Sequence, residues 1–198
     1  MKIRGKHIDE VIRFDIIPSD GTRSPIPKTN SLEVDFIIKQ LQDIRSSGKQ
    51  VSLGIITPHT NQQEYLFQQI RRIPESQELF DKNKLKIMTF DTCQGEERDI
   101  IFYSMVASEE DDRLGYVFPK SLDNIDLEDE SKIRVQRLNV GFSRARECMH
   151  FVLSKGIDKF SGTVGDVLRH YSTVMNQSMN ERLPDEVDPR SPMEAPAS

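Results

Sequence analysis

Hydrophobic and polar residues alternate along this chain with two different periods. Apolar residues recur at helical spacing, as i, i+3, i+4 and i+7, over residues 34–44 and again over residues 164–174. Short runs rich in β-branched and aromatic residues indicate strands at 11–17, 51–56, 85–90, 100–106 and 148–153. Strands that alternate with helices of ten or more residues predict an α/β fold with a mostly parallel sheet.

The start of the first helix carries a capping signal. Asn30 is followed three residues later by Glu33, which is the spacing of a capping box. We expect the Asn30 side chain to accept a hydrogen bond from the first turn, and the Glu33 side chain to reach back to the start of the helix. Another helix is expected to open at Thr60 or Asn61, directly after the strand over residues 51–56, which is apolar enough to be buried on both faces.

Arginines are concentrated in residues 135–146, a segment with helical spacing. Arg137, Gly141 and Arg144 fall at i, i+4 and i+7, so a helix would place them on one stripe. A guanidinium held on a packed helix suits a bidentate grip on phosphate or carboxylate. Spacing alone favours an ordinary surface helix with solvated arginines, so other segments have to decide between these two interpretations.

The net charge of −5 is distributed unevenly along the 198 residues. Residues 108–130 carry nine acids against two basic residues, and residues 176–198 carry five acids against two, so the remainder has a net charge of +5. A mildly basic body is compatible with nucleic-acid or nucleotide binding. We interpret residues 1–175 as one domain with an acidic insertion at 108–130, and residues 176–198 as a disordered tail or linker.

The composition argues against several classes of protein. No apolar run approaches the roughly 20 residues that span a bilayer, and Met1 is not followed by a signal-peptide pattern, so no membrane partner is expected. Cys93 and Cys148 are too few for a disulfide framework or a cysteine-based metal site, and we predict a cytoplasmic protein without a metal site of its own. The acids of residues 108–130 show no metal-ligand spacing, which leaves a nuclease poorly supported.

Three segments occur in an order that resembles the second RecA-like domain of superfamily 1 helicases, in the branch that includes the RNA helicase of nonsense-mediated decay. Residues 55–62 read Ile-Ile-Thr-Pro-His-Thr-Asn-Gln, residues 89–99 resemble helicase motif V, and residues 137–146 resemble motif VI. Asn30 with Glu33 also fits an Asn-x-x-Glu signature that opens this domain. The resemblance implies a RecA-like P-loop NTPase fold, with a mostly parallel sheet and helices on both faces.

The resemblance implies that residues of motifs V and VI bind the nucleotide. Arg144 occupies the position of the arginine that reaches the γ-phosphate across the cleft between two RecA-like domains, and Arg137 would position the motif. Glu97 would bind the ribose hydroxyls, with a solvated turn glutamate as the alternative. Gly95 would supply the backbone geometry and close approach of the turn, and Gln94 would relay between nucleotide and nucleic acid.

Other residues are implied to contact the nucleic-acid backbone. They follow the ends of predicted strands: Thr57, Pro58, His59, Thr89 and Thr92. Hydroxyls and backbone amides at strand ends grip phosphates without reading bases, although simple capping of the strand ends is an equal alternative for each threonine. Ligands of parallel sheets collect at the carboxyl ends of the strands, so we expect the residues of all three segments at that edge.

The sequence also departs from a complete helicase. It contains no G-x-x-x-x-G-K-[ST] loop and no Asp-Glu pair at a strand end placed to hold Mg²⁺, both of which belong to the first RecA-like domain. Motif VI reads Gly141-Phe142-Ser143 where many relatives have Ala-Leu-Thr.

The resemblance therefore implies the C-terminal motor half of an ATP-dependent helicase or translocase, which is inert as an ATPase alone. Its partners would be single-stranded nucleic acid, the N-terminal RecA-like domain of the same protein, and ATP with Mg²⁺ bound mainly by that other domain. The alternative is a non-catalytic module that keeps the fold and binds nucleic acid or a protein.

Overall fold

The computed structural model of the protein describes residues 2–3, 6–18, 26–107, 114, 117–119 and 141–180. Its centre is a sheet of the strands β3 (Ile12–Ile16), β4 (Leu53–Thr57), β5 (Lys86–Thr89), β6 (Arg98–Ser104) and β7 (Ala145–Leu153). The strands lie in the order β3-β7-β6-β4-β5, and every neighbouring pair is parallel. The predicted α/β fold with a parallel sheet is confirmed.

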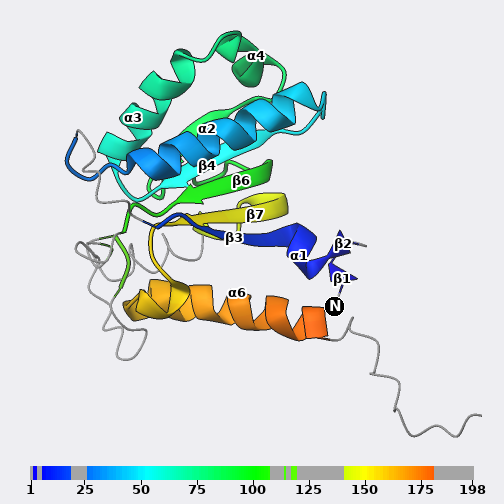
Figure 1. The fold of residues 1–198 in the computed structure, drawn as a ribbon, viewed down its shortest axis with the longest axis vertical. Helices are drawn as coiled ribbons and strands as arrows, with labels where there is room; N and C mark the ends of the chain where they lie inside the picture. Colours follow the sequence, from blue (N-terminus) through cyan, green and yellow to red (C-terminus); the bar gives the residue numbers. More distant parts are fainter. Residues whose placement is uncertain are drawn as a thin grey trace, which may run out of the picture.

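Helices cover both faces of this sheet, as Figure 1 shows. One face carries α2 (Ser31–Ser46), α3 (Thr60–Arg71) and α4 (Ser76–Asp81), and the other carries α6 (Gly162–Asn180). The short elements are β1 (Lys2–Ile3) and β2 (Lys6–His7), which pair antiparallel, the helix α1 (Ile8–Val11) and the 3-10 helix η2 (Ile157–Lys159). The prediction of helices on both faces is confirmed.

The predicted elements differ from the observed ones mainly at their ends. No helix is predicted from the sequence where α4 lies, because a helix of six residues shows too little periodicity to be recognised. Helix α6 continues through Asn180, past the predicted domain end at residue 175. Residues 181–198 lie outside the described residues, and so does most of the acidic insertion predicted at 108–130.

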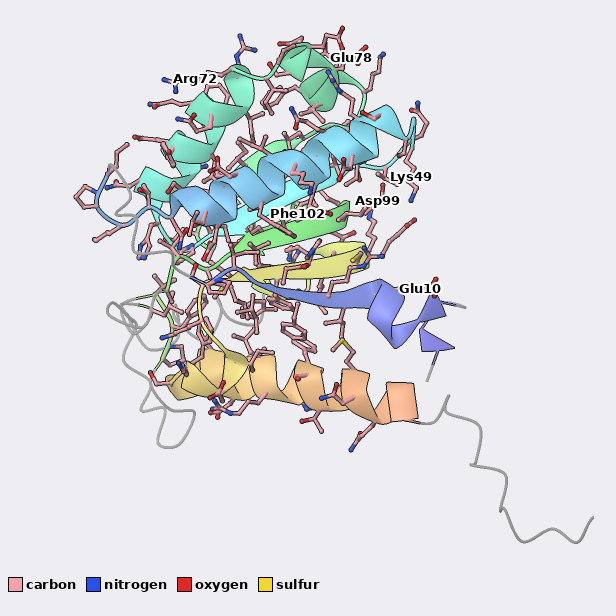
Figure 2. All side chains as sticks on the ribbon, viewed as in Figure 1. Glu10, Lys49, Arg72, Glu78, Asp99 and Phe102 are labelled. Atoms are coloured by element: carbon pink, nitrogen blue, oxygen red, sulfur yellow. The ribbon has the colours of Figure 1, made fainter. Side chains whose placement is uncertain are left out.

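The apolar core lies in two layers, one on each face of the sheet. Ile55 and Leu66 belong to the layer under α2 and α3, whereas Ile56 and Leu168 belong to the layer under α6. Phe102 of β6 lies between the sheet and α2, as Figure 2 shows. Successive residues of a strand point to opposite faces, so a strand covered on both sides must be apolar throughout. The prediction that β4 is buried on both faces is confirmed, since all five of its residues are buried.

The expected helix through the arginine segment ends earlier than its spacing predicts. Gly141 is its last helical residue, Phe142 and Ser143 form a turn, and β7 begins at Ala145. The prediction that Arg144 lies on this helix is therefore wrong. The reason is competition from the sheet, because Ala145 pairs with a residue of β6 and its backbone is drawn into the strand. The remainder of the segment, including Arg137, lies outside the described residues.

Candidate functional site

Residues of motifs V and VI come together at the amino edge of the sheet, where β6 and β7 begin. Arg98 pairs with Ala145, and the Arg98 N–H donates to the Arg144 carbonyl at 3.2 Å. Arg146 Nε donates to Glu97 Oε2 at 3.0 Å, in an exposed ion pair. The expectation that all three segments gather at the carboxyl ends of the strands is therefore wrong for the backbones of Glu97 and Arg144.

The turn between β5 and β6 explains this position. Both strands are parallel to β4, so the turn must run back along the sheet from one edge to the other. At its start the Cys93 N–H donates to the Thr89 carbonyl at 3.0 Å. Near its end Glu96 Oε1 accepts from Lys86 Nζ at 2.7 Å, beside the start of β5. Asp99 marks this amino edge in Figure 2.

Gln94 and Gly95 lie exposed in the middle of this turn. Gly95 has a φ of 78°, in the left-handed region that glycine adopts without steric cost. A Cβ added at Gly95 would meet no atom within 4 Å. The backbone conformation of the turn, and not a close approach, therefore requires glycine at this position.

Arg144 is half-buried in the loop that precedes β7, and its Nη2 donates to Ser143 Oγ at 3.2 Å. Burial raises the pKa of the Cys93 thiol and of the Tyr103 hydroxyl, and the charge of Arg144 lowers both. Cys93 and Tyr103 belong to the core layer under α6. The charge of Arg144 therefore acts on two groups of the layer under α6.

The loop that carries Arg144 is fixed by aromatic packing. Tyr103 Oη donates to the Gly141 carbonyl at 2.9 Å. The ring of Phe142 lies 5.4 Å from that of Phe90 and 5.2 Å from that of Tyr103, measured between centroids. A Cβ added at Gly141 would overlap the Phe90 ring. Any side chain at residue 141 would therefore have to displace the Phe90 ring.

The remaining predicted site residues lie at the carboxyl edge, after β4 and β5. Thr57 is fully buried, and its Oγ1 is a buried side-chain oxygen without a hydrogen-bond partner among the described residues. Pro58 is buried and Thr89 is 7% exposed, whereas His59 is half-buried and Thr92 is exposed. Thr92 Oγ1 accepts from the Thr89 N–H at 2.9 Å, which is a strand-end cap. His59 and Thr92 are the residues of this set that a ligand can reach directly.

Sequence reasoning missed two sets of residues. The first is Arg146, which forms the ion pair with Glu97. Its place two positions after Arg144, within the same arginine-rich segment, could have marked it as a candidate. Asn30 accepts from the Glu33 N–H at 3.0 Å, as the capping box predicts, but the Glu33 side chain does not reach back to it. That carboxylate is instead bonded to Ser104, beyond the reach of any local pattern.

Within the described part of the chain, no group of three or more His, Cys, Asp or Glu side chains is placed to hold a metal ion. No described helix is both long enough and apolar enough to cross a bilayer. Among the described site residues, Glu97 and the Arg144 backbone lie at one edge of the sheet, and the predicted hydroxyl groups lie at the other.

Comparison with known proteins gives three findings. The family model of an AAA domain matches residues 9–155. The helicase Sen1 of Schizosaccharomyces pombe is 26% identical over 140 residues, which cover 69% of this chain and 7% of Sen1. The crystal structure of the C-terminal domain of a possible DNA helicase from Lactobacillus plantarum WCFS1 covers 83% of each chain, with 14% identity and a TM-score of 0.43. The chain thus spans a small fraction of the length of this curated relative.

Proposed function

The chain belongs to the AAA domain family, and on that premise we propose that it is the C-terminal motor half of an ATP-dependent superfamily 1 helicase. Its resemblance to the second RecA-like domain of these helicases is confirmed by the family match and by the similarity to a helicase. In the proposed enzyme, ATP hydrolysis in the cleft between two RecA-like halves drives movement along single-stranded nucleic acid.

The observation that carries this proposal is the pairing of motif V with motif VI at the start of β6 and β7. The bond from the Arg98 N–H to the Arg144 carbonyl, at 3.2 Å, holds the two turns side by side. Arg144 then supplies a guanidinium to the γ-phosphate, where it stabilises charge on the transferring phosphoryl group. Glu97 accepts from the ribose hydroxyls with its carboxylate oxygens, and Arg146, 3.0 Å away, orients that carboxylate. Arg137 and Gln94 keep the supporting roles that the resemblance implies.

Magnesium and most of the nucleotide contacts belong to the other RecA-like half in this proposal. The chain has no phosphate-cradling loop, and its described residues offer no carboxylate cluster. The chain alone therefore binds ATP weakly and hydrolyses none.

The carboxyl edge provides part of the single-strand surface. Thr92 and His59 are accessible there, and His59 follows the Thr57-Pro58 turn as the N-cap of α3. Hydroxyl and backbone groups of this kind grip the sugar-phosphate backbone without reading bases. A direct contact from the Thr57 or Thr89 hydroxyl requires a small opening of this edge, because both side chains are buried.

The test is ATP turnover by the longer protein that contains this chain. Arg144→Ala is expected to lower kcat by about 10³-fold or more, as expected for loss of an arginine finger, and Arg144→Lys is expected to recover little, because lysine cannot present a planar fork. Arg71→Ala is the matched control, since Arg71 lies at the end of α3 and bonds to Gln77. Unchanged turnover in Arg144→Ala would remove the finger role, and robust ATPase activity of the isolated chain would contradict the division of labour between two halves.

A further inference from the structure

A fully buried carboxylate, Glu33, lies where β6, β7 and the starts of α2 and α3 meet. Its Oε2 accepts from Ser104 Oγ at 2.6 Å, and its Oε1 accepts from Ser154 Oγ at 2.7 Å. The Val106 N–H lies 3.1 Å from both oxygens. Ser104 ends β6 and Ser154 follows β7, so one side chain joins the exits of two neighbouring strands to α2.

The surrounding hydrogen bonds orient both serine hydroxyls toward Glu33. Asn30 and Gln62 have fixed orientations, because Asn30 Oδ1 accepts from the Glu33 N–H and Gln62 Oε1 accepts from the Asn30 N–H. Their amide nitrogens therefore donate to the two serine hydroxyls, Gln62 Nε2 to Ser104 Oγ at 2.9 Å and Asn30 Nδ2 to Ser154 Oγ at 2.5 Å. Each serine then uses its own hydrogen for Glu33. Both hydroxyls and the Val106 N–H donate to the Glu33 carboxyl, so every bond in this network is made only when that carboxyl accepts and does not donate. The ionised carboxylate is the form that only accepts.

The network around Glu33 holds Val106 in an unusual backbone conformation. Its φ is 63°, in the left-handed region that β-branched residues rarely adopt. Glu33 bonds to the N–H of this same residue, two positions after the end of β6. The conformation persists because the surroundings compensate its cost, and the bonds to Glu33 are the charge-assisted part of that compensation.

The charge state of Glu33 is open to change near neutral pH. Burial raises the pKa of the Glu33 carboxyl from its ordinary value of 4.5 to about 7, and the bonds from Ser104, Ser154 and Val106 lower it. The titratable groups of the adjoining elements are engaged elsewhere or exposed: Asp35, Lys39 and Glu64 are exposed, Asp99 bonds to Ser52, Tyr103 to Gly141, His150 to Asp15, and Lys155 lies over the Phe160 ring. Burial therefore raises the pKa of the Glu33 carboxyl, and the two hydroxyls and one backbone amide partly oppose that rise.

We propose that Glu33 is a proton-sensitive latch, which in its ionised form holds Val106 and the exits of β6 and β7 against α2 and α3. Protonation adds a hydrogen where the network supplies only donors, so one serine hydroxyl must turn away and the bond to Val106 weakens. The strained backbone at Val106 then relaxes. Through Gln62, which lies in the first turn of α3 and donates to Ser104, the latch also holds the start of that helix.

Local and global stability respond to this latch with opposite signs. The folded pKa of Glu33 lies above its unfolded value, so its contribution to global stability is fully present below about pH 4.5 and is lost as the pH rises through about 7. Protection of the Val106 amide from hydrogen exchange follows the ionised form and rises over the same range. A merely buried carboxyl would show the first trend without the second.

The test follows the Glu33 carboxyl by ¹³C NMR and the Val106 protection factor by hydrogen exchange, both from about pH 5 to pH 9 on the 198-residue chain. Both transitions are expected to share one midpoint, with about tenfold higher protection of Val106 in the ionised form. Ser154→Ala removes a bond that lowers the pKa of Glu33, so both midpoints move upward together. Glu33→Gln abolishes both transitions.

Ser47→Ala is the matched control, because this hydroxyl donates to the Ile44 carbonyl at the far end of α2. It is expected to move neither midpoint. Level protection of Val106 across the Glu33 titration would overturn the latch, and so would a Val106 midpoint that stays in place when Ser154→Ala moves that of Glu33. Absence of any Glu33 titration in this range would overturn its sensitivity to protons. Ser154→Ala keeps the test decisive if Glu33→Gln does not fold.

Discussion

Gly141 lies where a single residue packs against the aromatic core under α6. The carbonyl of Gly141 accepts from Tyr103, and its Cα lies against the ring of Phe90. Phe90 is 2% exposed, and its ring fills the space that a methyl group at residue 141 would need. The side chain at residue 141 and the Phe90 ring therefore compete for the same volume.

Gly141→Ala is therefore expected to lower the free energy of unfolding by about 1–3 kcal/mol, because the added methyl group overpacks the site. Denaturant unfolding measures this loss. Phe90→Leu in the same chain makes room, so the double variant is expected to lose less stability than the sum of the two single variants. Strict additivity of the two losses would show that residue 141 and the Phe90 ring do not compete for space.

At the scale of elements, β5 shows how the fold treats an edge strand. It is the outermost strand on its side of the sheet, where unpaired backbone groups can template association. The Ile87 carbonyl accepts from Gln63 Nε2 of α3 at 2.8 Å, and the Thr89 N–H donates to Thr92 Oγ1 at 2.9 Å. Side chains from a helix and from a turn therefore occupy two backbone groups of this edge.

Gln63→Ala is expected to release the Ile87 carbonyl. The loss of one hydrogen bond costs about 0.5–1.5 kcal/mol, and the freed edge raises the tendency of the chain to self-associate. Denaturant unfolding and sedimentation at rising concentration measure the two effects. Gln69→Ala is the control on the same helix, because in the described contacts the Gln69 side chain bonds only to the exposed Arg72 side chain. Equal behaviour of the two variants would show that Gln63 does not protect the edge.

At the scale of the whole molecule, the predicted site residues divide between the two edges of one sheet. The predicted nucleotide group, with Glu97 and the Arg144 backbone, lies at the starts of β6 and β7. The predicted nucleic-acid group, with Thr57 and Thr89, ends β4 and β5. The turn from Phe90 to Glu97 connects the two groups, and its Phe90 and Cys93 belong to the core layer under α6.

The proposed single-strand surface predicts salt-dependent binding by this chain. Affinity for an oligonucleotide is expected to fall about tenfold between about 50 and 200 mM salt, which corresponds to two or three phosphate contacts. His59→Ala is expected to weaken binding at every salt concentration. Lys82→Ala is expected to leave binding unchanged, because Lys82 is the C-cap of α4 and is paired with Glu78. Fluorescence anisotropy measures both. Affinity independent of salt would contradict a phosphate-gripping surface.

Local patterns in the sequence were sufficient for the five strands of the sheet and for its long helices, whereas the short α4 was missed. Hydrophobic periodicity marks α2 and α6, and the uniformly apolar run of β4 indicates a strand covered on both faces. The ordered motifs identify the family before any coordinate is known. Such signals work because helix and strand periods depend on neighbours only a few positions away.

Tertiary structure alone decided where the predicted site residues lie and which partners they have. Pairing of β7 with β6 ended the arginine helix at Gly141 and placed Arg144 in a loop, against the local spacing. Glu33 bonds to Ser104 and Ser154, 71 and 121 residues away, so its pattern as a helix cap could not reveal its partners. Periodicity records which face of an element is apolar, whereas hydrogen bonds across such separations exist only after the sheet has brought distant segments together.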